Sequence, residues 1–321
     1  FLGSDTDDYT YEALKLFLLG AISRAFKPGC KFEVMLCLVG GQGAGKSSFF
    51  RLLAVNDDWF SDDLKKLDDE NVYRKMQGHW IIEMSEMIAT ANAKSIEEIK
   101  SFLSRQKETY KIPYETHPAD RKRQCVFGGS SNTLDFLPLD RTGNRRFVPV
   151  MVYPERAEVH ILADEQASRE YINQMWAEAM EIYRSGNFRL RFSPAMNDYL
   201  KAHQKDFMPE DTKAGQILDY LERYSGSIVC SKQLYKEALG HDYDEPKQWE
   251  LREINDIMNN AVTGWMAFSN PRYFPEPYRR QKGWERIRND NEPDNSMDGF
   301  QEIPTEEMEQ LGLPEEWLKQ K

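Results

Sequence analysis

A run of glycines followed by a lysine and a serine is the stretch best suited to chemistry. Residues 40–47 read Gly-Gly-Gln-Gly-Ala-Gly-Lys-Ser, after an apolar run at 34–39 and before an amphipathic run at 49–53. Glycines let a loop turn backbone N–H groups toward an anion, and a following helix presents its positive end to the same charge. Strand, glycine loop and helix in this order predict a P-loop that binds the phosphates of ATP.

The residue types in this loop have separate expected roles. Lys46 would contact the β- and γ-phosphates, and the Ser47 hydroxyl would be a Mg²⁺ ligand. A glycine-rich turn without a ligand is the alternative interpretation. The residues expected to hold the nucleotide are Gly40, Gly41, Gln42, Gly43, Ala44, Gly45, Lys46, Ser47 and Ser48.

Two acidic residues close the next apolar run, Trp-Ile-Ile-Glu-Met-Ser-Glu-Met at 80–87. A strand that ends in acids after a P-loop is typical of a Walker B element, which supplies a carboxylate to Mg²⁺ and another to the attacking water. We expect Glu86, at the strand end, to be the catalytic base and to lie beside the metal. Glu83 and Ser85 share a face of an extended strand, so either could be the metal-side residue.

Two further polar groups border strand-like runs. Asn132 ends the run at 124–132, where an amide could orient the lytic water, although Ser-Asn is also common in turns. Arg145 and Arg146 precede another strand-like run at 147–152. They are either surface charge or an arginine finger that neutralises charge on a neighbouring subunit's nucleotide, with Arg146 the first choice and Arg145 the second.

A basic and aromatic stretch at 105–123 predicts a hairpin of two short strands. It holds six basic and three acidic residues, although the whole chain of 321 residues has a net charge of −11. Such a hairpin could grip a DNA backbone through Lys107, Lys111, Tyr114 and His117, or it could be a solvated charged hairpin.

The C-terminal part changes pattern. Helix-like runs at 213–224, 231–239 and 246–260 precede a basic aromatic pair of strands, which predicts a winged-helix arrangement. If this part binds DNA, the wing should contact phosphates; docking to a protein is the alternative. The wing residues are Arg279, Arg280, Lys282 and Arg286.

Composition sets the remaining limits. Apolar content is 40% and charged content 30%, and no apolar run approaches the roughly 20 residues of a membrane span. The four cysteines lack metal-ligand spacing, which favours free thiols in a reducing cytoplasm. The chain begins with Phe1 rather than methionine, so we expect a piece of a longer protein. The expected divisions are a helical segment at 1–28, a P-loop ATPase core at 29–152, a helical extension at 153–208, a winged-helix-like domain at 209–288 and an acidic tail at 289–321.

With these pieces in order, the chain resembles the virulence-associated protein E family of ATPases, which is related to the superfamily 3 helicases of phages and mobile elements. The resemblance implies an α/β, AAA+-type P-loop core that forms a homo-hexamer, with ATP between subunits and DNA in the central channel. It matches Lys46 and Ser47 to Walker A, Glu86 and Glu83 to Walker B, Asn132 to a sensor, and Arg146, then Arg145, to the arginine finger. It rests on residues 40–47, 78–86, 102–105, 123–127 with Asn132, and 142–147.

The sequence therefore predicts an ATP-dependent DNA helicase or replication-initiation motor of a prophage or mobile element. Its expected partners are single-stranded or forked DNA, further copies of itself, and a primase or another replication protein. An ATP-gated DNA-binding or regulatory protein without unwinding activity is one alternative. A P-loop phosphotransferase is another, but it leaves Asn132 and the two arginines without a role.

Overall fold

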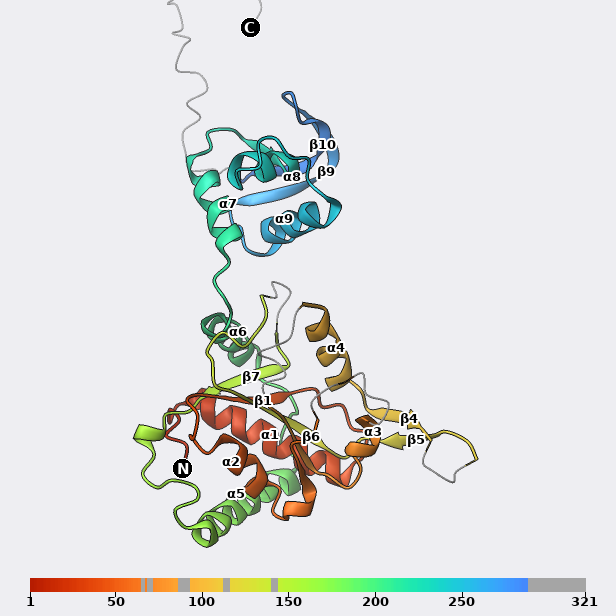
Figure 1. Ribbon diagram of the computed structural model, residues 1–321, viewed down its shortest axis with the longest axis vertical. Helices are drawn as coiled ribbons and strands as arrows, with labels where there is room; N and C mark the ends of the chain where they lie inside the picture. The colour runs from red at the N-terminus through yellow and green to blue at the C-terminus, as the bar shows by residue number, and fades with distance from the viewer. Residues whose placement is uncertain (65–66, 68–71, 86–92, 112–115, 140–143, 288–321) are drawn as a thin grey trace, which may run out of the picture. The chain divides into compact units, whose positions relative to one another are not determined.

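The computed structural model divides the chain into two compact units, Phe1–Thr212 and Lys213–Lys321. It describes residues 1–64, 67, 72–85, 93–111, 116–139 and 144–287 (Figure 1). Each unit has its own hydrophobic core.

A five-stranded parallel sheet forms the centre of the first unit. Its strand order is β2-β3-β6-β1-β7, and every pairing is parallel. The strands of parallel sheets are buried on both faces, which explains their nearly continuous apolar sequences. The strands are β1 (Met35–Val39), β2 (Phe60–Ser61), β3 (Ile81–Ser85), β6 (Val126–Ser131) and β7 (Phe147–Met151).

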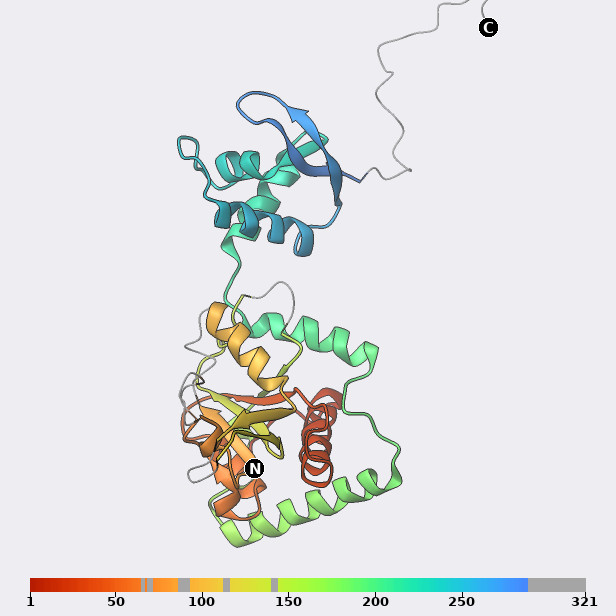
Figure 2. The same cartoon turned by 90° about the vertical axis from the view of Figure 1, so that its right-hand side faces the viewer.

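Helices cover both faces of this sheet, and alternate residues of β1 pack against different helices. Leu36 and Leu38 share a core with α1 (Asp8–Phe26), α2 (Lys46–Leu53) and α5 (Glu165–Ser185). Figures 1 and 2 show these helices beside the sheet.

The other face of the sheet has a separate core. Met35, Cys37 and Val39 of β1 point to it because successive side chains of a strand face opposite sides. They pack with residues of α3 (Val72–Lys75) and α4 (Ala93–Leu103). The first unit is therefore a mixed α/β structure in three layers, as the sequence predicts.

Short helices and one hairpin complete this unit. The predicted hairpin is confirmed: β4 (Lys107–Tyr110) pairs antiparallel with β5 (Ala119–Lys122). Helix α6 (Pro194–His203) has Ser193 as its N-cap, whose side chain accepts a hydrogen bond from Met196 N–H. Three 3₁₀ turns lie at Asp57–Trp59, Pro154–Arg156 and Gln204–Phe207.

The second unit combines helices with a three-stranded antiparallel sheet in the order β8-β10-β9. Its core includes Ile217, Leu234, Ile257 and Trp284. The helical runs and the terminal hairpin follow the sequence pattern, whereas β8 was not predicted. The elements are α7 (Thr212–Arg223), β8 (Ile228–Cys230), α8 (Ser231–Gln233), a π-helical turn (Leu234–Ala238), α9 (Gln248–Asn260), β9 (Trp265–Phe274) and β10 (Arg279–Arg286).

Two expectations from composition concern the cysteines and helices that could cross a membrane. All four cysteines are free thiols, and Cys37, Cys125 and Cys230 are buried. Within the described residues, no helix combines the length and the apolar content that a membrane crossing requires.

Candidate functional site

Residues 40–47, here called the glycine loop, follow the carboxyl end of β1 and lead directly into α2. β1 lies between β6 and β7, and ligands of open α/β sheets bind outside the carboxyl ends of such central strands. A Cβ on Gly40 would lie 2.3 Å from the Val152 carbonyl oxygen, so only glycine fits there. Gly43 and Gly45 have φ values of +81° and +77°, which side chains disfavour.

Lys46, the first residue of α2, places its ammonium inside this loop. Its Nζ donates to the carbonyl oxygens of Gly40 and Gly41, both at 2.7 Å, and to Oδ1 of Asn132 at 3.0 Å. The residue is 7% exposed, and burial lowers the pKa of the ammonium while the Glu83 carboxylate acts in the opposite direction. The structure thus brings the predicted lysine and the predicted sensor asparagine into direct contact.

Glu83 of β3 lies beside the start of α2. Its Oε1 accepts hydrogen bonds from Ser47 Oγ at 2.8 Å and from Ser130 Oγ, in β6, at 2.5 Å. The side chain is completely buried, and its Oε2 has no hydrogen-bond partner among the described residues. A buried carboxylate oxygen without a partner is costly, which points to a ligand that completes its bonding.

These oxygens suit a hard divalent cation. Mg²⁺ prefers oxygen ligands, keeps several waters and needs only one or two protein groups beside a phosphate. The hydroxyl of Ser47 and the second oxygen of Glu83 fit that demand. Ser47 and Ser85 also line a cavity beside the glycine loop. No cluster of three or more His, Cys, Asp or Glu occurs in the part of the chain that is described. Glu86, the predicted catalytic base, lies outside the described residues.

A segment after β7 closes the other side of the glycine loop. His160 Nδ1 accepts from Leu162 N–H at 3.2 Å, which leaves the hydrogen of the neutral ring on Nε2, 3.3 Å from the Gly43 carbonyl oxygen. Ile161 is fully buried, and a Cβ on Gly45 would lie 2.8 Å from its Cγ2. The sequence gives no signal for His160, because this residue lies 117 residues from its partner Gly43.

A cavity of about 360 Å³ lies beside the glycine loop. The loop after β1, the carboxyl end of β3 and the end of β6 each contribute to its lining, which does not include Glu83. Its lining residues are Gln42, Gly43, Ala44, Gly45, Lys46, Ser47, Ser48, Ser85, Ser130, Asn132, His160 and Leu162.

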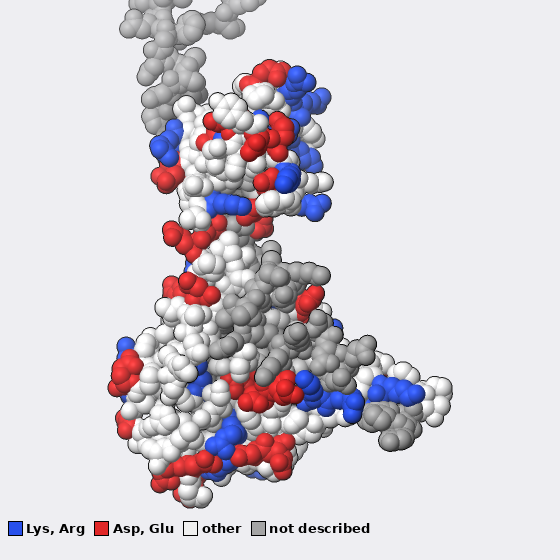
Figure 3. Space-filling view, viewed as in Figure 1, with Lys and Arg blue, Asp and Glu red and all other residues white. Residues whose placement is uncertain are grey.

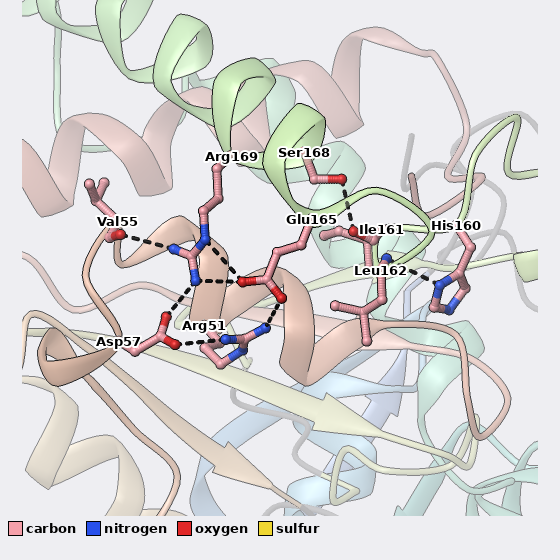
Figure 4. A network of polar contacts seen from close by, with 9 residues as sticks. All are labelled: Arg51, Val55, Asp57, His160, Ile161, Leu162, Glu165, Ser168 and Arg169. Atoms are coloured by element: carbon pink, nitrogen blue, oxygen red, sulfur yellow. Dashed lines mark hydrogen bonds and ion pairs between the residues drawn. The ribbon is translucent and has the colours of Figure 1, made fainter.

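A ring of four charged side chains joins α2, the helix after the glycine loop, to α5, as Figure 4 shows. Arg51 of α2 donates to Asp57 at 2.7 Å and to Glu165 at 2.9 Å, and Arg169 donates to the same two carboxylates at 2.8 Å each. The bond from Arg169 lowers the pKa of Asp57, and the bond from Arg51 lowers the pKa of Glu165. Arg169 also donates to the Val55 carbonyl at 3.0 Å, so α5 is fixed to the end of α2.

Arg145 and Arg146 lie at the amino ends of the strands, at the end of the sheet opposite the glycine loop. The Arg146 carbonyl accepts from Met35 N–H at the start of β1, five paired residues away from the glycine loop. At ~3.3 Å per strand residue this is a separation of roughly 16 Å along β1. Glu33 accepts from both arginines, and Ser104 Oγ lies 2.9 Å from Arg146 Nε. The Arg145 side chain is 71% exposed and that of Arg146 is 20% exposed.

The predicted DNA-contacting residues of the hairpin are exposed. Lys107 of β4 pairs with Asp120 of β5, while Lys111 and His117 flank the two strands. Figure 3 shows Lys and Arg gathered over this hairpin. Tyr114 lies outside the described residues.

The predicted wing residues of the second unit differ in their contacts. Arg279 pairs with Glu276 at 3.2 Å, and Arg280 Nε donates to the Pro271 carbonyl at 3.4 Å. Lys282 is exposed on β10. Arg286 donates to two backbone carbonyls, at the end of α7 and in the turn after it, so it also helps to hold the unit together. Its expected role toward DNA stays a prediction.

Comparisons with known proteins identify the first unit. A sequence model of the virulence-associated protein E-like domain matches residues 1–209. No curated protein matches the chain. Among solved structures, the apo structure of the NrS-1 C-terminal region (305–718) aligns with a TM-score of 0.45 and 14% identity, over 87% of this chain and 72% of that one. An A-form apo structure of that region aligns with a TM-score of 0.48 and 14% identity, over 88% and 72%.

Proposed function

Because the chain belongs to the virulence-associated protein E-like domain family, we propose that it is an ATP-driven DNA motor of a prophage or mobile element. The glycine loop is its P-loop, the first unit is an AAA+-like ATPase core, and the second unit is a winged-helix domain. Hydrolysis at subunit interfaces of a hexameric ring moves DNA during replication initiation or unwinding. A primase or another replication protein is its expected partner.

The convergence of Lys46, Ser47, Glu83 and Asn132 at neighbouring strand ends carries this proposal. When ATP enters, phosphate oxygens replace the Gly40 and Gly41 carbonyls as acceptors for Lys46 Nζ. Asn132 stays beside that ammonium and orients water at the terminal phosphate. The amides of the glycine loop and the amino end of α2 stabilise the phosphate charge.

The second oxygen of Glu83, which has no hydrogen-bond partner among the described residues, supports a Mg²⁺ site next to Ser47. When bound, Mg²⁺ neutralises charge that develops on the phosphates. Ser47 Oγ would hold the ion, and Glu83 would accept hydrogen bonds from its waters. Glu86 remains our proposed base for the attacking water.

The position of the two arginines supports hydrolysis across a subunit interface. Arg145 and Arg146 lie at the amino end of β7, so they are far from the glycine loop of their own chain. An arginine that acts on a transferring phosphoryl group must touch it. We therefore assign the pair to the nucleotide of a neighbouring subunit, with Glu33 and Ser104 holding Arg146 in place.

DNA contacts come from the β4–β5 hairpin and from the basic side of the second unit. The hairpin would grip a DNA strand in the channel of the hexameric ring through Lys107, Lys111, Tyr114 and His117. Arg279, Arg280 and Lys282 would contact duplex phosphates near the fork.

A strand-displacement assay on a forked duplex tests this function. With ATP and Mg²⁺ the protein should release the labelled strand, whereas a non-hydrolysable ATP analogue or the Lys46→Ala variant should give no release. ATP-dependent binding of the fork without strand release would instead identify a regulatory DNA-binding protein. Absence of ATP turnover with or without DNA would overturn the proposal.

A further inference from the structure

A second cavity, of about 830 Å³, lies at the amino ends of the strands, at the end of the sheet opposite the glycine loop. Trp80 precedes β3 and Cys125 precedes β6, so the amino ends of these strands form its floor. Helices α1 and α5 supply one wall, and the β4–β5 hairpin supplies the other. The volume is within the range of pockets that bind organic ligands. The nucleotide-binding proposal does not use this cavity.

Aromatic rings dominate its lining, and we call it the aromatic pocket. Trp80 and Trp176 stack at 4.6 Å, and Trp59 meets Trp80 edge-on at 6.5 Å. The indole N–H groups of Trp80 and Trp176 donate to the carbonyls of Ala21 and Leu53, both at 3.0 Å, so these rings are held in fixed orientations. The six aromatic residues of the lining are Phe26, Trp59, Tyr73, Trp80, Tyr110 and Trp176.

Some of these rings are accessible from solvent. Trp59 is 45% exposed and Phe26 is 63% exposed. Large exposed aromatic groups around a cavity indicate a binding surface rather than a core. Tyr73 and Tyr110 form a second stacked pair at 5.7 Å on the hairpin side.

The charge at the rim selects the kind of occupant. The two acids in the lining are paired, because Glu108 binds the buried Arg123 and Asp120 binds Lys107. Lys122 is exposed and has no ion-pair partner among the described residues. The guanidinium of Arg121 lies 5.2 Å from the Tyr110 ring centre. The rim is therefore cationic beside aromatic faces, which is the combination that binds single-stranded nucleic acid.

We propose that the aromatic pocket receives an unpaired base of single-stranded DNA while the hairpin holds the adjacent phosphates. This assignment rests on the proposed function for DNA binding itself and adds a base-stacking site to it. The base inserts beside Trp59 and stacks on the aromatic lining, and Lys122 faces the phosphate backbone. Every base has a π face, so the pocket accepts bases without sequence preference.

A comparison of two strands of equal length tests the pocket separately from the motor. One is a deoxythymidine oligomer longer than the roughly 4–16 nucleotides of a typical single-strand site, and the other is an abasic strand with the same phosphates. We expect the wild-type protein to bind the thymidine strand about tenfold more tightly, as one stacked base allows. We also expect thymidine binding to quench the tryptophan fluorescence.

Trp59→Ala should remove the preference for the thymidine strand and leave the affinity for the abasic strand unchanged. Trp59→Phe should keep most of the preference for the thymidine strand. Trp249→Ala is the matched control, because it removes an exposed indole from the second unit, where Trp249 is 57% exposed against 45% for Trp59. Equal wild-type affinity for the two strands would overturn the pocket assignment and leave the DNA motor standing. Loss of self-association in Trp59→Ala, with no preference in the wild type, would show that a second copy of the chain fills the pocket. Failure of both strands to bind would overturn both proposals.

Discussion

At the scale of single residues, the unequal bonding of the two Glu83 oxygens is the most informative feature of the site. Oε1 accepts from Ser47 and Ser130, whereas Oε2 is buried without a partner among the described residues. Proteins retain such a costly group mainly where it has a chemical task. The adjacent Lys46 makes the site favourable to an anion, and Glu83 makes it favourable to a cation beside that anion.

Replacing this carboxylate should separate binding from hydrolysis. In Glu83→Gln the amide oxygen still accepts from Ser47 and Ser130, but the negative charge is lost. We expect ATP hydrolysis to fall about 100-fold, a typical loss when one electrostatic group of an active site is removed. The Mg²⁺ concentration for half-maximal activity should rise, while metal-free ATP binding should be retained.

Glu97→Gln on α4 is the control for this change, because that side chain is 69% exposed and forms an ion pair with Lys100 of the same helix. A Mg²⁺ titration of ATPase activity and a fluorescent ATP analogue measure the two effects. Unchanged turnover and Mg²⁺ dependence in Glu83→Gln would show that Glu83 is structural.

At the scale of secondary-structure elements, the charged ring couples the nucleotide loop to α5. Arg51 lies one turn after Ser47 on α2, and Glu165 begins α5 directly after the segment that contains His160. Ser168 Oγ donates to the Ile161 carbonyl at 2.8 Å, so the start of α5 also fixes the residue that packs on Gly45. A change in the loop is therefore transmitted to α5 through direct contacts.

Removing one member of the ring should loosen this coupling. Arg169→Ala deletes the bonds to Asp57, Glu165 and Val55, and we expect Tm to fall by about 2–4 °C. Hydrogen exchange should quicken in residues 157–163, because their anchor is weaker. Arg184→Ala, on the same helix and paired with the exposed Glu181, should change neither quantity. Equal effects of the two variants would argue against a coupling role for the ring.

The elements themselves follow from the sequence to a large extent. Apolar runs before residues 40, 86 and 132 predict buried strands, and the parallel order then brings their polar ends together. The contact between Lys46 and Asn132 could be anticipated in this way. The hairpin was predicted from its basic and aromatic residues, and it is present.

The remaining features depend on tertiary packing. His160 meets Gly43, and Arg169 meets Asp57, across more than 100 residues, so no local period or spacing encodes either contact. The aromatic pocket likewise draws its rings from α1, α3, α5, the hairpin, the 3₁₀ turn that ends at Trp59 and the residue before β3. The contacts of Arg286 with two backbone carbonyls are likewise tertiary, and its charge alone gave no sign of them.

At the scale of the whole molecule, the two halves of the proposed active site lie at opposite ends of the strands of one sheet. The glycine loop follows the carboxyl end of β1, and Arg145 and Arg146 lie at its amino end. One chain cannot close this distance without unfolding β1. Copies arranged head to tail can do so, because a heterologous interface repeated around a ring places the arginine edge of one copy on the loop edge of the next.

Mixing two inactive variants tests this central claim most directly. Lys46→Ala lacks a working loop but keeps its arginines, and the double variant Arg145→Ala/Arg146→Ala has the opposite defect. Each alone should hydrolyse ATP very slowly. Combined in equal amounts, they should recover on the order of a quarter of wild-type activity, because one interface in four then pairs an intact loop with intact arginines. A mixture no more active than the sum of its parts, or normal turnover by the double variant alone, would contradict hydrolysis across the subunit interface.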